Sequence, residues 1–484
     1  MTTVITTGLA FLLTVSLTMG DCPYQECVCR NKDIKCQNQG LDKMPPLIAG
    51  SVNTYQVLMI QNNRITSIPD KSIPSGLTEI DFGNNPISDI APSAFNNSGS
   101  TLETLSFTNT RLTQIPDAFL SLTKLTSLTI KNSPLQNWNL DVLKHIGASL
   151  RELTLNNVGL RSWPAWIANF PSLTDLSLSN SQLTPIPDTA FNMLTSSLKR
   201  LTIVSANLTS IPRALTVLSN LVSLDLSNNS ITEVENLPSQ SKLESLSLGF
   251  NNVSDGPKLV NELSPHAASL TYLYLHFNQL LVIPQLDHMT SLLIIHLDNN
   301  KISDPASGLL PSKVINLQLS ANNFQAIPNV VRQLNKLTSL FISDNSIQEI
   351  RLIDLPVQLS HLDIQNNAVK TLQDNTFPAN SSLRTLYLSR NPLASISNSA
   401  FKNLSGLDTL TLGNTNLTRV PTALSDLASL NTLDLSQNPR LICTCQEAGL
   451  VAWFQARPNL NVLGTCGDDS VHDFFTNLAT QCRR

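Results

Sequence analysis

The sequence predicts an α/β repeat solenoid, in which the short strands of successive repeats pair in parallel and a cysteine-rich cap closes each end. Three observations predict it. An apolar pattern, Leu-x-x-Leu-x-Leu-x-x-Asn-x-Leu, recurs about every 23 residues between positions 55 and 442. Eight cysteines fall in two groups of four, one at each end of that region. Hydrophobic residues make up 41% of the 484-residue chain but aromatic residues only 5%, which favours an aliphatic core.

The repeats are 17 in number, and their first apolar positions lie 22 to 27 residues apart. The second and third apolar positions of a repeat, such as Leu224 and Leu226, are two residues apart and therefore face the same side of a strand. One repeat cannot bury this side alone, but stacked repeats form a continuous core. The repeats begin at Tyr55, Leu77, Leu102, Leu125, Leu150, Leu173, Leu198, Leu221, Leu243, Leu270, Leu292, Val314, Leu337, Leu359, Leu383, Leu407 and Leu430.

The asparagine of the pattern stands where the strand turns, and its amide can satisfy backbone groups of neighbouring coils. Eleven of the 17 repeats have Asn there, and repeats 3 to 7 all lack it. We expect a local change of coil geometry in those repeats, with Asn109, Asn132 and Asn157 as candidates for compensation. The six exceptions are Thr110, Ser133, Val158, Ser181, Ala206 and Thr415.

The amino-terminal segment is typical of a secretory signal peptide. Residues 1–20 contain no charged side chain, and an apolar run from Leu9 to Leu17 is followed by small residues. The run is too short for a membrane-spanning helix, and no other segment reaches 18 apolar residues. We predict a signal peptide over 1–20, an amino-terminal cap over 21–54, repeats over 55–442 and a carboxy-terminal cap over 443–484, in a secreted, extracellular protein without a membrane span.

The cysteines favour disulfide bonds over zinc, because a secreted protein folds in an oxidising compartment. Pairing within each group of four leaves nine arrangements open. The even count leaves no thiol for catalysis. The cysteines are Cys22, Cys27, Cys29, Cys36, Cys443, Cys445, Cys466 and Cys482.

Both ends resemble the caps of extracellular leucine-rich repeat proteins, a family that includes Slit proteins, small leucine-rich proteoglycans and Toll-like receptor ectodomains. The first end reads Cys22-Pro23-x3-Cys27-x-Cys29-x6-Cys36. The last end reads Asn438-Pro439, then Cys443-x-Cys445, Trp453, Cys466 and Cys482. The sequence departs from the family at Arg440, where the family has Trp after Asn-Pro.

The resemblance implies a curved solenoid whose parallel sheet lines the concave face, with ligands bound mostly on that face. It also implies pairing of the first cysteine with the third and of the second with the fourth in each cap. The implied bonds are Cys22–Cys29, Cys27–Cys36, Cys443–Cys466 and Cys445–Cys482.

The strand position between the two inward apolar residues should face solvent. This position is mostly Ser or Thr in the first repeats, but repeats 10 to 15 bring in aromatic residues and histidine. Such residues and Arg are favoured at binding hot spots, and five strand spacings cover about 24 Å. The candidate ligand-binding residues are Tyr272, Tyr274, His276, His296, Phe341, His361, Arg384 and Tyr387. Phe250 and Phe277 directly precede the turn asparagine. Their side chains could therefore lie on the surface or in the core.

No catalytic or metal-binding motif is found. His276 and His296 lie diagonally on adjacent predicted strands, but the sequence places no third ligand near them, so no metal site is predicted. The chain has no phosphate-binding loop, His-Glu-x-x-His motif or nucleophile in a known context, so we expect no enzyme and no cofactor. The net charge of −4 and the 14% of charged residues also argue against a nucleic-acid partner.

The sequence thus predicts a secreted, non-enzymatic protein that binds a protein or glycan on the concave face of repeats 9–15. The alternatives are a structural protein of the extracellular matrix or of adhesion, and a non-catalytic subunit or inhibitor of an enzyme. Seven Asn-x-Ser/Thr sequons fit a secreted glycoprotein. They stand at Asn96, Asn207, Asn228, Asn252, Asn380, Asn403 and Asn416.

Overall fold

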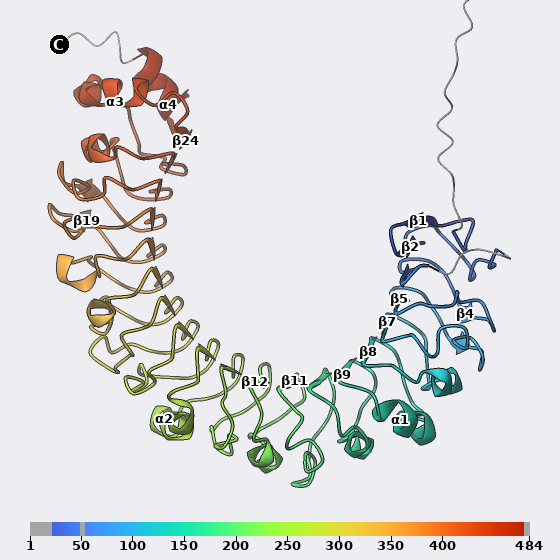
Figure 1. Cartoon of the computed structure of the whole chain (residues 1–484). Helices are drawn as coiled ribbons and strands as arrows, with labels where there is room; N and C mark the ends of the chain where they lie inside the picture. The colour runs from blue at the N-terminus through green and yellow to red at the C-terminus, as the bar shows by residue number, and fades with distance from the viewer. Residues whose placement is uncertain (1–21, 49–53, 479–484) are drawn as a thin grey trace, which may run out of the picture. The chain divides into compact units, whose positions relative to one another are not determined.

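A computed structural model describes residues 22–48 and 54–478, so the predicted signal peptide lies outside the described residues. The chain forms two compact units. The first covers the chain up to Gly159 together with Asn169–Ser172, and the second covers Leu160–Ala168 and the chain from Leu173 onward. In each unit the strands lie on one side, and the turns and short helices lie on the other (Figure 1).

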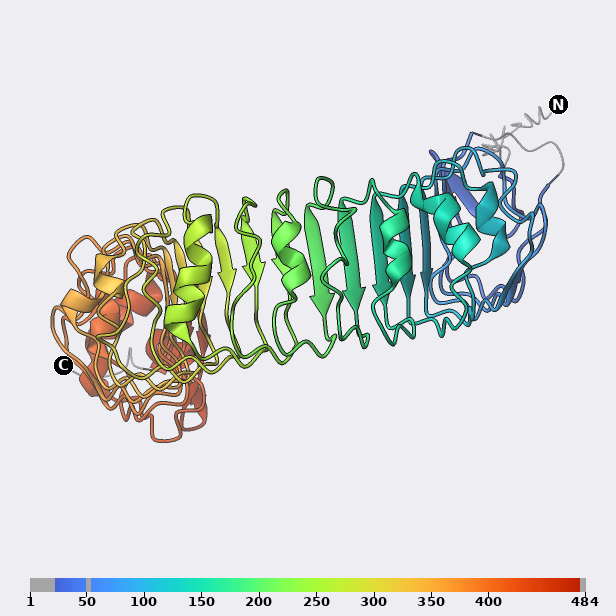
Figure 2. The same cartoon turned by 90° about the horizontal axis from the view of Figure 1, so that it is seen from below.

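Each predicted repeat contributes one strand to the described structure. Within each unit consecutive repeat strands pair in parallel, as predicted (Figure 2). In the first unit these strands are β3 (Val57–Met59), β5 (Glu79–Asp81), β7 (Thr104–Thr108), β8 (Ser127–Lys131) and β9 (Glu152–Asn156). In the second unit they are β10 (Asp175–Ser179), β11 (Arg200–Val204), β12 (Ser223–Asp225), β13 (Ser245–Ser247), β14 (Tyr272–Tyr274), β15 (Ile294–His296), β16 (Asn316–Gln318), β17 (Ser339–Phe341), β18 (His361–Asp363), β20 (Thr385–Tyr387), β22 (Thr409–Thr411) and β23 (Thr432–Asp434).

The core follows the predicted alternation. Leu224 and Leu226 are buried, whereas Asp225 between them is half-buried on the open side of the sheet. The strands of the second unit line the inner side of its bend, and we call their solvent side the concave face (Figure 1). The core is mainly aliphatic, but the first unit adds a column of fully buried phenylalanines that the low aromatic content did not predict. They are Phe82, Phe95, Phe107 and Phe119.

The turn asparagines satisfy backbone groups of neighbouring coils, as predicted. The Asn300 side-chain oxygen accepts a hydrogen bond from the Leu280 backbone N–H at 3.0 Å. Its Nδ2 donates to the carbonyl oxygens of Leu275 and Leu297 at 2.9 and 3.1 Å. Since these groups are buried, the side chain takes the place of water at the end of the strand.

Repeats 3 to 7, which lack this asparagine, differ in coil geometry, as expected, whereas repeat 16, with Thr415 there, keeps a three-residue strand. β7 to β11 have five residues each, whereas the other repeat strands of the described chain have three. Hydroxyls replace the amide in repeats 3 and 4, where Thr110 and Ser133 hydrogen-bond each other at 2.7 Å. Asn109, Asn132 and Asn157 do not take over the missing role; they donate along a separate ladder of side chains at the preceding position.

Short elements on the other side connect the strands. Pro116 and Pro212 are extended, as the sequence favours for proline, and each leads into a 3₁₀ turn. The helical elements of the repeats are η1 (Asp117–Ser121), α1 (Leu140–Gly147), η2 (Ala165–Asn169), η3 (Arg213–Val217), α2 (Gly256–Leu263), η4 (Ser264–His266), η5 (Val331–Gln333), η6 (Leu352–Asp354) and η7 (Thr422–Asp426). Two small parallel sheets pair β4 (Ser67–Ile68) with β6 (Asp89–Ile90) and β19 (Thr371–Leu372) with β21 (Ser395–Ile396).

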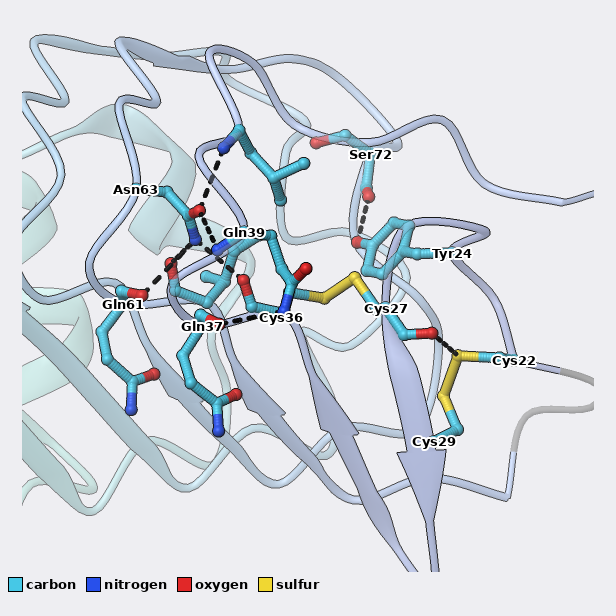
Figure 3. The surroundings of a disulfide bond; sticks show 12 residues. Cys22, Tyr24, Cys27, Cys29, Cys36, Gln37, Gln39, Gln61, Asn63 and Ser72 are labelled. Atoms are coloured by element: carbon cyan, nitrogen blue, oxygen red, sulfur yellow. Dashed lines mark hydrogen bonds between the residues drawn. A yellow bond between two sulfur atoms is a disulfide. The ribbon is translucent and has the colours of Figure 1, made fainter.

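The amino-terminal cap extends the sheet of the first unit. β1 (Val28–Arg30) pairs antiparallel with β2 (Asp33–Lys35), and β2 pairs in parallel with β3. Disulfide bonds join Cys22 to Cys29 and Cys27 to Cys36, in the pairing that the resemblance implies (Figure 3). The buried Tyr24 hydroxyl donates to the Ser72 carbonyl oxygen at 2.6 Å and so ties the cap to the repeats (Figure 3).

The carboxy-terminal cap covers the other end of the second unit. Its β24 (Asn461–Leu463) pairs in parallel with β23, and the Trp453 indole N–H donates to the Leu427 carbonyl oxygen at 3.2 Å. Cys443 is bonded to Cys466 as implied, and Cys482 lies outside the described residues. The other elements of the cap are η8 (Cys445–Leu450), α3 (Val451–Gln455), β25 (Thr465–Cys466), β26 (Asp469–Ser470), α4 (Val471–Asp473) and η9 (Phe474–Leu478).

Candidate functional site

The sheet register brings the predicted middle positions into one row on the concave face. Consecutive Cα partners from β14 to β20 are Tyr274, His296, Gln318, Phe341, Asp363 and Tyr387. A second row, two residues earlier on each strand, contains Tyr272 and His361. The side chains of both rows are half-buried or exposed, because the apolar positions between them point into the core.

Five ring side chains on β14 and β15 and in the turns that follow β13 and β14 form one cluster, which we call the Tyr274 cluster: Phe250, Tyr274, His276, Phe277 and His296. The Tyr274 ring packs edge-on against the His296 ring, with centroids 4.9 Å apart. The Phe250 ring packs edge-on against the His276 ring at 5.2 Å. These edge-to-face contacts have the geometry that aromatic pairs prefer, so the rings hold one another in place.

Phe250 and Phe277 belong to the surface, which decides between the two positions that the sequence left open. Their side chains are 45% and 43% exposed, and their rings stack at 4.2 Å with an interplanar angle of 10°. Both residues have left-handed backbone, with φ of 55° and 51°. Such a conformation is an outlier for a bulky residue, and strained residues of this kind cluster at functional sites.

A second group, the Phe341 cluster, lies further along the same face and consists of Phe341, His361 and Tyr387. The His361 ring lies 4.7 Å from the Phe341 ring and 5.1 Å from the Tyr387 ring. Gln318 occupies the strand between the two clusters. Arg384, another predicted site residue, is exposed, and its guanidinium donates to the Gly406 carbonyl oxygen at 3.5 Å.

Burial shifts the acid–base behaviour of several of these groups. It lowers the pKa of His296, and the nearby His276 adds to that effect while the Asp298 charge opposes it. It also lowers the pKa of His361, against the opposing charge of Asp363. Since a lower pKa favours the uncharged imidazole, both rings present a nitrogen lone pair at neutral pH.

The structure brings a third polar group to the two histidines of the Tyr274 cluster. One ligand atom each from His276, His296 and Asp298 lies within 4.8 Å of the other two. The sequence prediction that no third ligand lies near these histidines is therefore wrong. Asp298 follows His296 by two residues and pairs with His276 beyond the end of β14, a position that the search along the middle row did not include.

The His276 ring occupies space that a glycine leaves open. A Cβ atom at Gly249 would lie 2.5 Å from Cε1 and 2.6 Å from Nε2 of His276. The His276 Nδ1 is buried and has no hydrogen-bond partner among the described residues. Gly249 is thus a site residue that the sequence reasoning missed, because an isolated glycine in a repeat gives no sign of which ring lies against it.

The predicted glycosylation sites differ in exposure. Six of the seven sequon asparagines are exposed in the structure. Asn403 is half-buried, and its Nδ2 donates to the Phe377 carbonyl oxygen at 2.9 Å. In the described part of the chain, no helix combines the length and the apolar character needed to cross a membrane.

Comparisons with known proteins agree with this architecture. Residues 75–135 and 381–439 match the leucine rich repeat family model, and residues 165–255 match the BspA type leucine rich repeat region. Mouse podocan is 30% identical over 180 residues, which cover 31% of this chain and 29% of podocan. Chicken Tsukushi is 30% identical over 237 residues, covering 47% of this chain and 56% of Tsukushi. Bovine lumican is 29% identical over 185 residues, covering 37% and 52%. The matched stretches span less than two thirds of each relative.

Solved structures extend the similarity of fold over most of the chain. A chain of the mouse RP105/MD-1 complex has a TM-score of 0.60 at 18% identity, covering 92% of this chain and 96% of that one. A leucine-rich repeat protein of Leptospira interrogans has a TM-score of 0.58 at 22% identity, covering 90% and 96%. The family-model matches, the repeat strands and the disulfide bonds at both ends show a leucine-rich repeat chain with cysteine-rich ends, similar to podocan and lumican.

Proposed function

We propose that this chain is a secreted, non-enzymatic binding protein that holds a protein ligand against the concave face of repeats 9–15, at the Tyr274 and Phe341 clusters. The observation that carries the proposal is the exposed, strained and stacked pair Phe250 and Phe277. Apolar rings held in solvent contribute less to stability than buried ones, but they are effective anchors for a partner that covers them.

The dimensions of the surface also support a macromolecular ligand. Tyr274 and Tyr387 are separated by five strand spacings, which is about 24 Å. Two anchoring clusters with a polar residue between them suit a protein surface better than a single small molecule. Because the rings already pack on one another, binding would cost little ordering entropy.

The similar structures add support at the level of the family. One is a complex of Toll with Spatzle, whose chain has a TM-score of 0.58 and 18% identity, and another is the RP105/MD-1 complex. Leucine-rich repeat proteins of related fold are thus seen with a second protein.

The experiment compares capture of partners by the wild-type protein and by two cluster variants. One variant carries Tyr274→Ser with Phe277→Asn, and the other carries Phe341→Ser with Tyr387→Ser. The control variant carries Leu281→Ser and Ile353→Ser, which remove apolar side chains that are 60% and 62% exposed away from the strands of the sheet. Bound proteins from extracellular fluid are identified by mass spectrometry, and folding is checked by circular dichroism.

A partner that the wild type and the control hold, and that a folded cluster variant loses by tenfold or more, supports the proposal. Equal capture by all variants contradicts it. Loss of capture after the partner is deglycosylated would indicate that the ligand is a glycan rather than a protein surface.

A structural role in the extracellular matrix is the second candidate. It is favoured by the relatives podocan and lumican, which are small leucine-rich proteoglycans. That role predicts association with insoluble matrix that neither cluster variant reduces.

A further inference from the structure

We propose that His276, His296 and Asp298 form a binding site for a divalent transition metal ion of the Zn²⁺ class on the concave face. Two imidazoles and a carboxylate are a ligand set that Zn²⁺ accepts, with a fourth position left for water or a partner's side chain. The proposal concerns the isolated protein, so it stands or falls independently of the proposed protein ligand.

The distances bring the three groups close to a coordination sphere. One ligand atom from each residue lies within 4.8 Å of the other two. In a tetrahedral site with metal–ligand bonds of about 2.0–2.1 Å, ligand atoms lie about 3.3 Å apart. The ligand atoms must therefore approach by at most about 1.5 Å, which small rotations of the half-buried side chains can supply.

The sheet fixes the positions of these groups. His296 is the last residue of β15, and Asp298 follows it on the same face. His276 lies beside Asp298, because the backbone N–H of Phe277 donates to the Asp298 carbonyl oxygen at 3.0 Å. Since the backbone of both strands is hydrogen-bonded, binding a metal ion needs no rearrangement of the main chain.

The surroundings leave the ligand atoms available. The His276 Nδ1 is buried without a hydrogen-bond partner among the described residues, which costs free energy unless another group satisfies it. The Asn299 Nδ2 donates to one Asp298 carboxylate oxygen at 3.0 Å, which orients the carboxylate as an outer-shell partner does.

The aromatic rings of the cluster form the walls of the site. Tyr274 packs edge-on against His296, and Phe250 packs edge-on against His276. Gly249 admits the His276 ring, since a side chain there would collide with it. Apolar walls limit the access of water and so strengthen the interaction between the ion and its ligands.

The test is isothermal titration of the tag-free protein with ZnCl₂, with MgCl₂ as the comparison ion because Mg²⁺ prefers ligand sets made of oxygen. We expect one site per chain with a dissociation constant in the micromolar range for Zn²⁺ and no heat for Mg²⁺. His276→Asn, His296→Asn and Asp298→Asn should each weaken Zn²⁺ binding at least tenfold. Gly249→Ala should weaken it as well, since the His276 ring must move.

The matched control is His361→Asn. His361 also lies on the concave face, has a buried unpartnered Nε2, and precedes Asp363 with the same spacing that separates His296 from Asp298. It has no second histidine within reach to complete a group of three among the described residues. Its substitution should leave the Zn²⁺ affinity unchanged.

X-ray absorption of the zinc-loaded protein should show two imidazole nitrogens and one carboxylate oxygen at about 2.0–2.1 Å. The proposal is overturned if the wild type binds no Zn²⁺, if the three ligand variants bind it as tightly as the wild type, or if His361→Asn weakens binding as much as they do. Circular dichroism of each variant separates loss of the site from loss of the fold.

Discussion

Replacing both Phe250 and Phe277 with Asn should alter the stability of the fold only slightly, although each replacement removes a large apolar side chain. The position directly before the turn is left-handed in all 17 described repeats, and ten of them have Asn there. The variant therefore installs the residue that the same backbone accepts elsewhere in this chain.

The expected change in the free energy of unfolding is the sum of three contributions. Left-handed backbone costs an ordinary residue roughly 1–2 kcal/mol, which Asn largely avoids. Each ring is a little over half buried, so its removal loses about 1 kcal/mol of the 1.5–3 kcal/mol expected for full burial. The stacked pair contributes about 1 kcal/mol beyond burial. At each position the relief of backbone strain nearly offsets the loss of burial. The net loss of stability is therefore about 1 kcal/mol, which comes from the lost stacking contact.

The stack can be lost only once, so the effects should not add. Phe250→Asn and Phe277→Asn should each cost about 1 kcal/mol, and the double variant should also cost about 1 kcal/mol rather than 2. The measurement is native-state hydrogen exchange of the Leu248 and Leu275 amides, which donate to the Tyr274 and His296 carbonyl oxygens at 2.8 Å. A loss of 1 kcal/mol makes exchange about fivefold faster.

Phe324→Ala is the control, because Phe324 is fully buried in the same unit. It should cost about 3–5 kcal/mol, which accelerates exchange of neighbouring amides more than a hundredfold. If Phe277→Asn accelerates exchange as strongly as Phe324→Ala does, the phenylalanine pair is core packing. The argument that it is retained for binding would then fail.

Three further predictions follow from other contacts. Asn300→Ala should destabilise the fold by about 3 kcal/mol in urea unfolding, since it leaves the Leu280 N–H and carbonyl oxygens unsatisfied in the core; a loss below 1 kcal/mol would contradict the proposed role of the turn amide. Burial lowers the pKa of His266 and His361, so the unfolded chain binds protons more tightly and stability should fall as the pH drops below about 6.5. Urea unfolding at several pH values would show this, and a rise in stability on acidification would refute the sign. Peptide mapping of the protein produced in a glycosylating cell should find Asn403 unmodified, whereas the exposed sequon asparagines are open to glycans.

The repeat pattern predicts the fold well because its signals are local and recur. Leu224 and Leu226 are buried as the alternation requires, and the same reasoning places Tyr274 and His296 in one row on the open face. The sequence also predicts that the coils of repeats 3 to 7 differ from the others, but not that the difference is a longer strand, since repeat 16 lacks the turn amide as well and keeps a strand of three residues. The buried phenylalanine column of the first unit does not, because an average composition does not say where a few aromatic residues gather.

The candidate site is predicted less completely, because its geometry depends on pairs of residues in different repeats. Asp298 lies beyond the end of its strand, so a search along the middle row passes over it, although its pairing with His276 follows from the register. The side on which Phe277 lies depends on the backbone conformation before the turn, which a pattern of apolar positions does not encode. The role of Gly249 is to leave room for the His276 ring of the next repeat, which the sequence of one repeat does not show.

These three residues differ from their counterparts in most other repeats, and that difference is itself informative. Leucines and turn asparagines satisfy the requirements of the coil, so a residue such as Leu273 reports the fold and nothing more. A phenylalanine in left-handed backbone breaks a local rule, and the stacking and partial burial of this pair outweigh the strain by only about 1 kcal/mol. Seven repeats lack Asn directly before the turn, but only Phe250 and Phe277 place an aromatic ring there, and they follow neighbouring strands beside the His276–Asp298 pair. Aromatic rings placed there by drift would be scattered among the repeats, so their gathering at the Tyr274 cluster favours a ligand there over a uniformly structural surface.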